Sequence, residues 1–197
     1  MKRSGRALFC ILAMASALQP SSATATETLR HTDDGIIRCA VARAFLRNTE
    51  LNRGGKPRWP SGWLLSRTPE EFESKGWTAA SFIASGHWRL APSVGIVTQF
   101  LSTKTNGPAE ECPRFGAFVR SLGGTTLSLI HPRPMDRPCR HIVLLSTPVV
   151  SPDRLEAMIS VGHTCGWYVG GAGNALYLRK DKSGDWKVAG FKDDWIS

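Results

Sequence analysis

His163 and Cys165 are the residues whose types and spacing come closest to catalytic chemistry. Side chains on a strand repeat every two residues, so the imidazole and the thiol would lie on the same side of a strand. A nucleophilic cysteine also needs a group that orients its base, and no neighbouring residue is an obvious candidate for that role. We therefore expect a structural cystine at Cys165, assign no catalytic residue, and favour a non-enzymatic protein.

A basic segment and a glycine-rich segment carry the best candidates for binding. Arg137 and Arg140 lie in a proline-interrupted stretch of arginines and histidines, where guanidinium groups could hold an anionic group. The alternative is an ordinary solvated loop. Trp167 and Tyr168 lie in Gly166–Gly173, a predicted loop, and exposed aromatic side chains on loops often form binding surfaces. These four side chains are the predicted contact residues.

Phosphate, metal and paired-acid chemistry find little support. Gly170–Gly173 precede a predicted strand, whereas a phosphate-binding loop needs a helix after its glycines. No two cysteines have the C-x-x-C spacing of a zinc site, so we expect neither a metal nor a cofactor. The adjacent acids Glu70-Glu71 and Asp193-Asp194 indicate a helix start or a solvated edge.

The first 25 residues predict where the protein is located. Basic residues at Lys2, Arg3 and Arg6 precede a short apolar run, and small residues end the segment at Ala25. This order is typical of a secretory signal peptide, and the run is too short to span a bilayer. We predict a signal peptide at 1–25 and a single domain at 26–197, exported to the periplasm or the medium of a bacterium, with no transmembrane segment.

The chain is basic, with a formal net charge of +9. In an exported protein this charge could favour an anionic polymer or an acidic envelope protein as partner. The alternative is that the charge serves solubility alone. A nucleic acid partner is not expected.

Four cysteines remain after the signal segment, and an oxidising compartment favours two disulfides among them, with three possible connectivities. If a hairpin folds about Pro152, residues whose numbers sum to about 304 lie opposite each other. Cys139 and Cys165 then lie within bridging reach, which leaves Cys39 for Cys112. We predict these two pairs.

The pattern of apolar residues predicts helices in the first half of the chain. One runs from a cap at Asp33 or Asp34 to about Asn48, with Ile37, Ala40, Val41, Ala44 and Phe45 as its apolar stripe. Shorter helices are predicted at Thr68–Ser74, Ala79–Ala84 and Arg114–Leu122, and strands at Ser93–Leu101 and Thr125–Ile130.

The last 57 residues predict four strands joined by short turns, at His141–Val149, Leu155–His163, Ala175–Lys180 and Trp186–Phe191. Short strands with turn residues between them indicate an antiparallel meander. The expected fold class is therefore α+β, with N-terminal helices packed on a C-terminal antiparallel β-meander.

The C-terminal motifs carry a resemblance. Cys165-Gly166, Gly171-Ala-Gly173, Gly184-Asp-Trp-Lys-Val188 and the terminal Trp195-Ile-Ser197 resemble those of a group of uncharacterised exported bacterial proteins, over about the last 60 residues. Members of that group often carry a second cysteine shortly after the Cys-Gly pair. Val169 stands in that region here, and this departure favours Cys139 as the partner of Cys165. The resemblance implies no activity.

Together these features favour an exported, disulfide-stabilised binding protein, of an accessory or inhibitor-like kind. A secreted hydrolase that acts on an envelope polymer or nucleic acid is one alternative. A small-ligand binder of the NTF2-like sort is another, and it rests only on the analogy of one long helix followed by a curved sheet.

Overall fold

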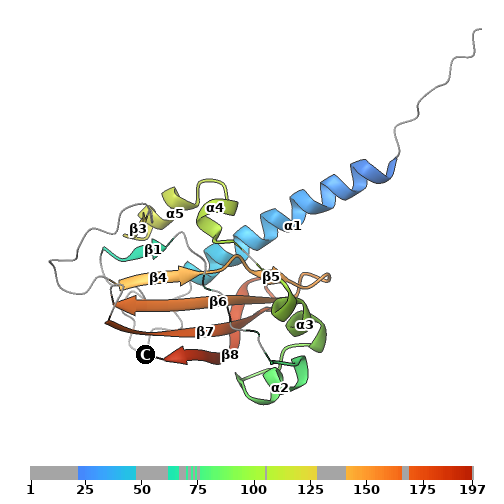
Figure 1. Ribbon diagram of the computed structural model, residues 1–197. Coiled ribbons are helices and arrows are strands. Elements are labelled where there is room, and N and C mark those ends of the chain that lie inside the picture. The colour runs from blue at the N-terminus through green and yellow to red at the C-terminus, as the bar shows by residue number, and fades with distance from the viewer. Residues whose placement is uncertain are drawn as a thin grey trace, which may run out of the picture.

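The computed structural model has an α+β fold, in which helices from the first half of the chain cover a largely antiparallel sheet (Figure 1). It describes residues 22–47, 62–66, 70, 72, 74, 76–104, 106–127, 141–165 and 169–196. The helices are α1 (Ser22–Arg47), α2 (Ala79–Ala84), α3 (Val94–Ser102), α4 (Pro108–Glu111) and α5 (Phe115–Ser121). The strands are β1 (Leu64–Ser66), β2 (His87–Trp88), β3 (Thr125–Leu127), β4 (His141–Leu145), β5 (Val149–Val150), β6 (Glu156–Cys165), β7 (Val169–Lys180) and β8 (Trp186–Ile196).

The sheet confirms the predicted meander and extends it. Its strand order is β2-β8-β7-β6-β4-β1-β3, and β5 pairs with the same strand, β6, as β4 does. The neighbours from β4 to β8 are antiparallel, whereas β1 lies parallel to both β3 and β4. The predicted strand His141–Val149 is thus two strands, because residues 146–148 leave the ladder between β4 and β5.

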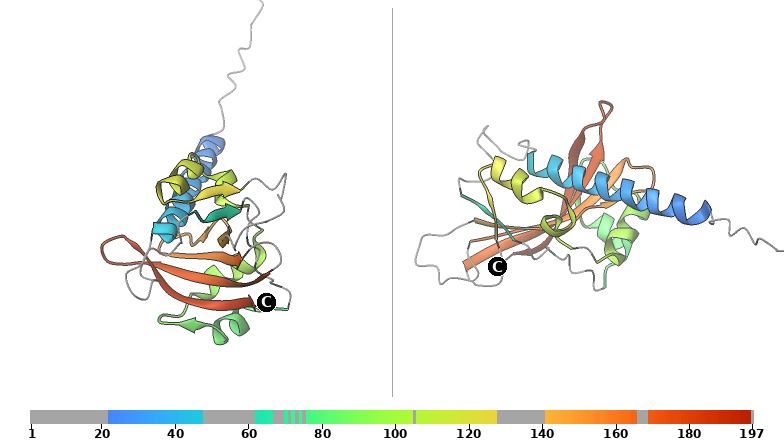
Figure 2. Two further views of the ribbon diagram at one scale, coloured as in Figure 1. Left: turned by 90° about the vertical axis from the view of Figure 1, so that its left-hand side faces the viewer. Right: turned by 90° about the horizontal axis from the view of Figure 1, so that it is seen from above.

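Helices cover both faces of this sheet (Figure 2). On one face α1, α4 and α5 pack over a buried apolar cluster that includes Phe45, Trp63 and Phe115. On the other face α2 and α3 pack over a smaller, aromatic cluster around Phe82 and Tyr177. We call these the α1 face and the α3 face.

Helix α1 ends at Arg47, close to the prediction, but it begins at Ser22, so the predicted start at Asp33 or Asp34 is wrong. Its buried positions are Cys39, Val41, Ala42, Phe45 and Leu46, whereas Ala40 is exposed. The predicted stripe is therefore only partly correct. The buried arc follows Cys39, which bonds to α4, rather than the most apolar line of the helix.

The predicted strand at Ser93–Leu101 is wrong, because α3 occupies this segment. Ser93 caps the helix by accepting a hydrogen bond from the Ile96 backbone N–H at 3.3 Å. Ile96, Val97 and Phe100 then recur at helical spacing on the buried side. Burial of that stripe outweighs the β-propensity of the branched residues.

Of the other short helices predicted from the sequence, two are confirmed and one is wrong. Helix α2 has the predicted bounds and begins with a capping box between Thr78 and Ser81, and α5 confirms the helix predicted at Arg114–Leu122 to within one residue. The helix predicted at Thr68–Ser74 is wrong where the structure describes it, since Glu70, Phe72 and Ser74 belong to no helix.

The predicted loop Gly166–Gly173 is a strand from Val169 onward, because β7 begins there. The hairpin register also differs from the prediction. Cys165 lies opposite His141, rather than opposite Cys139. The turn is centred later than Pro152, since the Ser151 N–H donates to the Glu156 carbonyl and Arg154 takes a left-handed φ of 61°.

No helix among the described residues is long and apolar enough to cross a membrane.

Candidate binding surface on the α1 face

The predicted contact residues lie outside what the structure describes. These are Trp167, Tyr168, Arg137 and Arg140. Cys139 lies outside it too, and Cys165 is described only as a backbone position on β6, so the predicted Cys139–Cys165 disulfide stays a prediction. His163 is exposed on β6.

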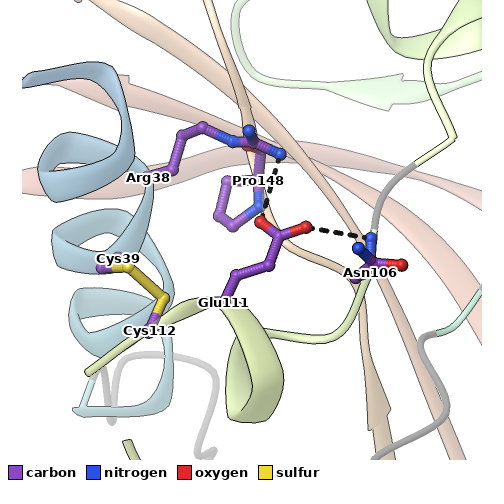
Figure 3. Close-up of polar contacts among 6 residues, drawn as sticks. All are labelled: Arg38, Cys39, Asn106, Glu111, Cys112 and Pro148. Atoms are coloured by element: carbon purple, nitrogen blue, oxygen red, sulfur yellow. Dashed lines mark hydrogen bonds and ion pairs between the residues drawn. A yellow bond between two sulfur atoms is a disulfide. The ribbon is translucent and has the colours of Figure 1, made fainter. Parts of the chain in front are cut away.

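The Cys39–Cys112 disulfide is present as predicted, and it joins α1 to the end of α4 (Figure 3). The two Cα atoms are 5.5 Å apart and the half-cystines are 73 residues apart in the sequence. Both are buried, at 6% and 4% exposure. The bond therefore fixes the segment that follows Cys112 against the middle of α1.

Polar contacts reinforce this junction (Figure 3). The Arg38 Nε–H donates to the Pro148 carbonyl at 2.8 Å, and a second guanidinium nitrogen lies 3.6 Å from the Glu111 carboxylate. The other Glu111 oxygen accepts from the Asn106 N–H at 3.2 Å. One α1 arginine thus ties α4 to the chain between β4 and β5.

Two further arginines of α1 lie over one aromatic ring. The guanidinium carbons of Arg43 and Arg47 are 5.9 Å and 5.0 Å from the ring centre of Phe118 on α5, within the range of cation–π attraction. Arg43 also donates from Nη2 to the Pro113 carbonyl at 2.6 Å. Arg43 is therefore held by two contacts and the exposed Arg47 by one.

A groove of about 420 Å³ lies at the start of α5. Arg114 and Arg120, both exposed, line it together with Gly116 and Thr126. Arg114 adopts a left-handed φ of 57°, which is uncommon outside glycine. The Arg120 Nη1 lies 3.7 Å from the position that a Cβ on Gly116 would take. We call Arg43, Arg47, Arg114 and Arg120 the arginine surface.

No described carboxylate compensates the charge of this surface. Among the described residues, the ion pairs engage Arg38, His87 and Arg154, and no carboxylate lies within pairing distance of any arginine of the arginine surface. The nearby acid Glu111 is directed to Arg38. The Arg114 and Arg120 guanidinium groups, which line one groove, can therefore act together on a negatively charged group from outside.

No local sequence pattern predicts this surface. Its arginines come from two segments about 70 residues apart. The disulfide, the packing of Phe118 and the polar contacts of Arg38 and Arg43 bring these segments together. The predicted pairing of Cys39 with Cys112 is the one feature that could have located it.

A second hollow, on the α3 face, was also missed. A cleft of about 280 Å³ is lined by Glu70, Phe72, Phe100, Lys104 and Ser160, among others. Glu70 is only 6% exposed, so its interpretation as part of a helix start or a solvated edge is wrong. Nothing in Thr68-Pro-Glu-Glu indicates burial. The nearest signal is Gly162, since a glycine inside an apolar strand often marks a close approach.

No group of three histidine, cysteine, aspartate or glutamate side chains in the described part of the chain is arranged to hold a metal ion. No family model, curated protein or solved structure matches this chain.

Proposed function

We propose that this chain is an exported, disulfide-stabilised binding protein, and that its arginine surface engages an anionic polymer of the cell envelope. The observation that carries the proposal is the set of four arginines without a described carboxylate partner. Guanidinium groups form paired, charge-assisted hydrogen bonds with carboxylate, phosphate and sulfate oxygens. Such a surface is expected to bind anions favourably.

The support for the surface favours recognition. Arg43 and Arg47 are held over Phe118, and Arg114 follows directly from the segment that Cys112 fixes to α1. Side chains that are already ordered lose less conformational entropy on binding. Export is supported by the predicted signal peptide at 1–25 and by the disulfide, which persists in oxidising compartments.

The residues of the groove favour binding over hydrolysis. Of its lining side chains, only Thr126 carries a hydroxyl, and Cys112 is committed to its disulfide. A nucleophile needs a base within hydrogen-bond reach, and no carboxylate or histidine is among the groove's lining residues. On the same side of the sheet, the layer beneath α1 is filled by buried side chains such as Phe45, Leu65 and Ile159, so nothing described there supports the NTF2-like alternative.

The test measures binding of the mature chain to dextran sulfate and to poly-L-glutamate, with neutral dextran as the reference polymer. We expect the R114Q/R120Q double variant to bind both anionic polymers about tenfold more weakly, because two charge-assisted contacts are lost. Binding should also fall with added salt, since exposed charges are screened.

A matched control is R89Q/K182Q, which removes two exposed charges elsewhere on the molecule. It lowers the net charge equally and should keep near-wild-type affinity. Equal losses in the two double variants would show that net charge, and not this surface, determines binding. Wild-type protein that binds neither anionic polymer would overturn the proposal. If the protein instead captured an acidic envelope protein, the polymer would be the wrong partner.

A further inference from the structure

The α3 face carries a separate feature that the proposed function does not use. Along β6, the residues that point to this face change from Met158 to Ser160 and then Gly162. Glu70 lies above this polar end: a Cβ on Gly162 would fall 2.5 Å from the Glu70 Oε2. The glycine thus provides the space that the carboxylate occupies.

Glu70 is a costly residue to place there. A carboxylate that is 6% exposed loses most of its hydration and needs compensating partners. Glu70 already has a polar interaction within the protein, and the two oxygens of a carboxylate can accept about four hydrogen bonds in all. Because Glu70 lines the cleft, a donor can reach it from there.

The rest of the cleft is lined by aromatic, cationic and hydroxyl-bearing side chains. Phe72 and Phe100 form an aromatic wall, with ring centres 5.7 Å apart. The exposed Lys104 lines the same cleft and supplies a positive charge. Hydroxyl groups of Ser160 and Thr103 add polar lining.

We propose that this cleft binds a small zwitterion with an apolar body, of the kind represented by a free aromatic or aliphatic amino acid. The ligand ammonium donates to Glu70, its carboxylate meets Lys104, and its apolar part packs on Phe72 and Phe100. A purely cationic ligand would meet repulsion from Lys104, and a purely anionic one would meet repulsion from Glu70. The volume of about 280 Å³ lies just below the range of drug-sized pockets, which suits a ligand as small as an amino acid.

Calorimetric titration of the mature protein with three probes tests this assignment. L-phenylalanine carries both charges, phenethylamine only the ammonium, and 3-phenylpropionate only the carboxylate. We expect L-phenylalanine to bind about tenfold more tightly than either analogue, because each analogue lacks one charged contact. Failure of all three probes to bind, or equal binding of L-phenylalanine and 3-phenylpropionate, would overturn the proposal.

Two variants separate the two ends of the ligand. Glu70→Gln should weaken L-phenylalanine and phenethylamine by about tenfold and should strengthen 3-phenylpropionate, because its carboxylate no longer meets a like charge. Lys104→Gln should weaken 3-phenylpropionate and strengthen phenethylamine. Because Lys104 is exposed, this variant keeps the test usable if the Glu70 variant unfolds. Lys182→Gln, on the β7–β8 turn, is the matched control and should bind as wild type. Identical effects of both cleft variants on all probes would contradict the assigned orientation.

Discussion

The two faces of strand β6 differ in how far their apolar character extends. The residues that point to the α1 face, Ala157, Ile159 and Val161, are all apolar and buried. On the α3 face, apolar Met158 gives way to Ser160 and Gly162 within five residues. One strand therefore closes a hydrophobic layer on one side and opens a polar cleft on the other.

The two faces also differ in how far their candidate binding residues lie from their core. The α1 face has a continuous core and a covalent bond, so its partner-binding groups lie on the outer surface of the helices. The α3 face holds a smaller core, and its cleft reaches the sheet itself through Ser160. A ligand there would contact the same strand that the core depends on.

The largest expected effect comes from removing the covalent bond of the α1 face. In the C39S/C112S variant, the free energy of unfolding should fall by about 4 kcal/mol, the chain-entropy estimate for a loop of this length. Urea denaturation at equilibrium measures the loss. A variant is preferable to a reducing agent, which would also reach the other cysteines.

A more specific test is to measure which elements lose stability in the same variant. Hydrogen exchange should accelerate in α4 and α5, which the bond fixes to α1, and remain close to wild type in α2. Uniform acceleration across both faces would contradict the view that the two faces are stabilised separately.

An intermediate effect is expected on the α3 face from Gly162→Ala. The added Cβ would lie 2.5 Å from the Glu70 carboxylate and 3.1 Å from Leu144, so we expect a loss of about 1–3 kcal/mol from overpacking. Thermal and urea unfolding measure it.

Gly95→Ala is the matched control on the same face. Gly95 lies in α3, and its nearest neighbour would be 4.0 Å from the new Cβ. This change should be neutral or stabilise the protein by about 0.5–1 kcal/mol. A similar loss at both positions would show that the Gly162 site is not specially tight.

The smallest effect is expected from Tyr177→Phe at the other end of the α3 face. The buried Tyr177 hydroxyl donates to Glu156 Oε1 at 2.7 Å, and we expect its removal to cost about 1.5 kcal/mol near neutral pH.

The same variant should change the alkaline behaviour. Burial raises the pKa of Tyr177 well above its usual value, and the Glu156 carboxylate raises it further. Above pH about 10 the unfolded chain loses this proton while the folded chain keeps it, so wild-type stability falls as pH rises. Tyr177→Phe should lack that part of the decline when urea midpoints are compared at rising pH. Parallel curves for the two proteins would refute this assignment.

The sequence predicted the parts of the fold that depend on local signals. The capping residues of α2, the apolar spacing of α5 and the turn between β7 and β8 all act over a few residues. It failed at Ser93–Leu101, where β-branched residues were given more weight than a helical stripe that begins at a serine cap. At Gly171 and Gly173, glycine was interpreted as loop although these residues pair within the sheet.

The candidate sites depend on distant residues and were harder to predict. The Cys39–Cys112 bond was predicted by assigning Cys139 to Cys165 in a hairpin whose register differs in the structure. The arginines on the two segments that the bond joins share no local pattern. Glu70 is buried because Gly162, far along the chain, leaves space for it. Local propensity says nothing about such a contact.

The sequence separation of Cys39 and Cys112 also determines when the disulfide can form relative to export. With 73 residues between the two cysteines, the bond cannot close until the chain through Cys112 has reached an oxidising compartment. If the chain is exported as proposed, newly made protein in the reducing cytosol lacks this closure, and the segment with Arg114 is not yet fixed beside Arg43. The arginine surface is then completed only after translocation, which limits its contact with anionic polymers in the cytosol.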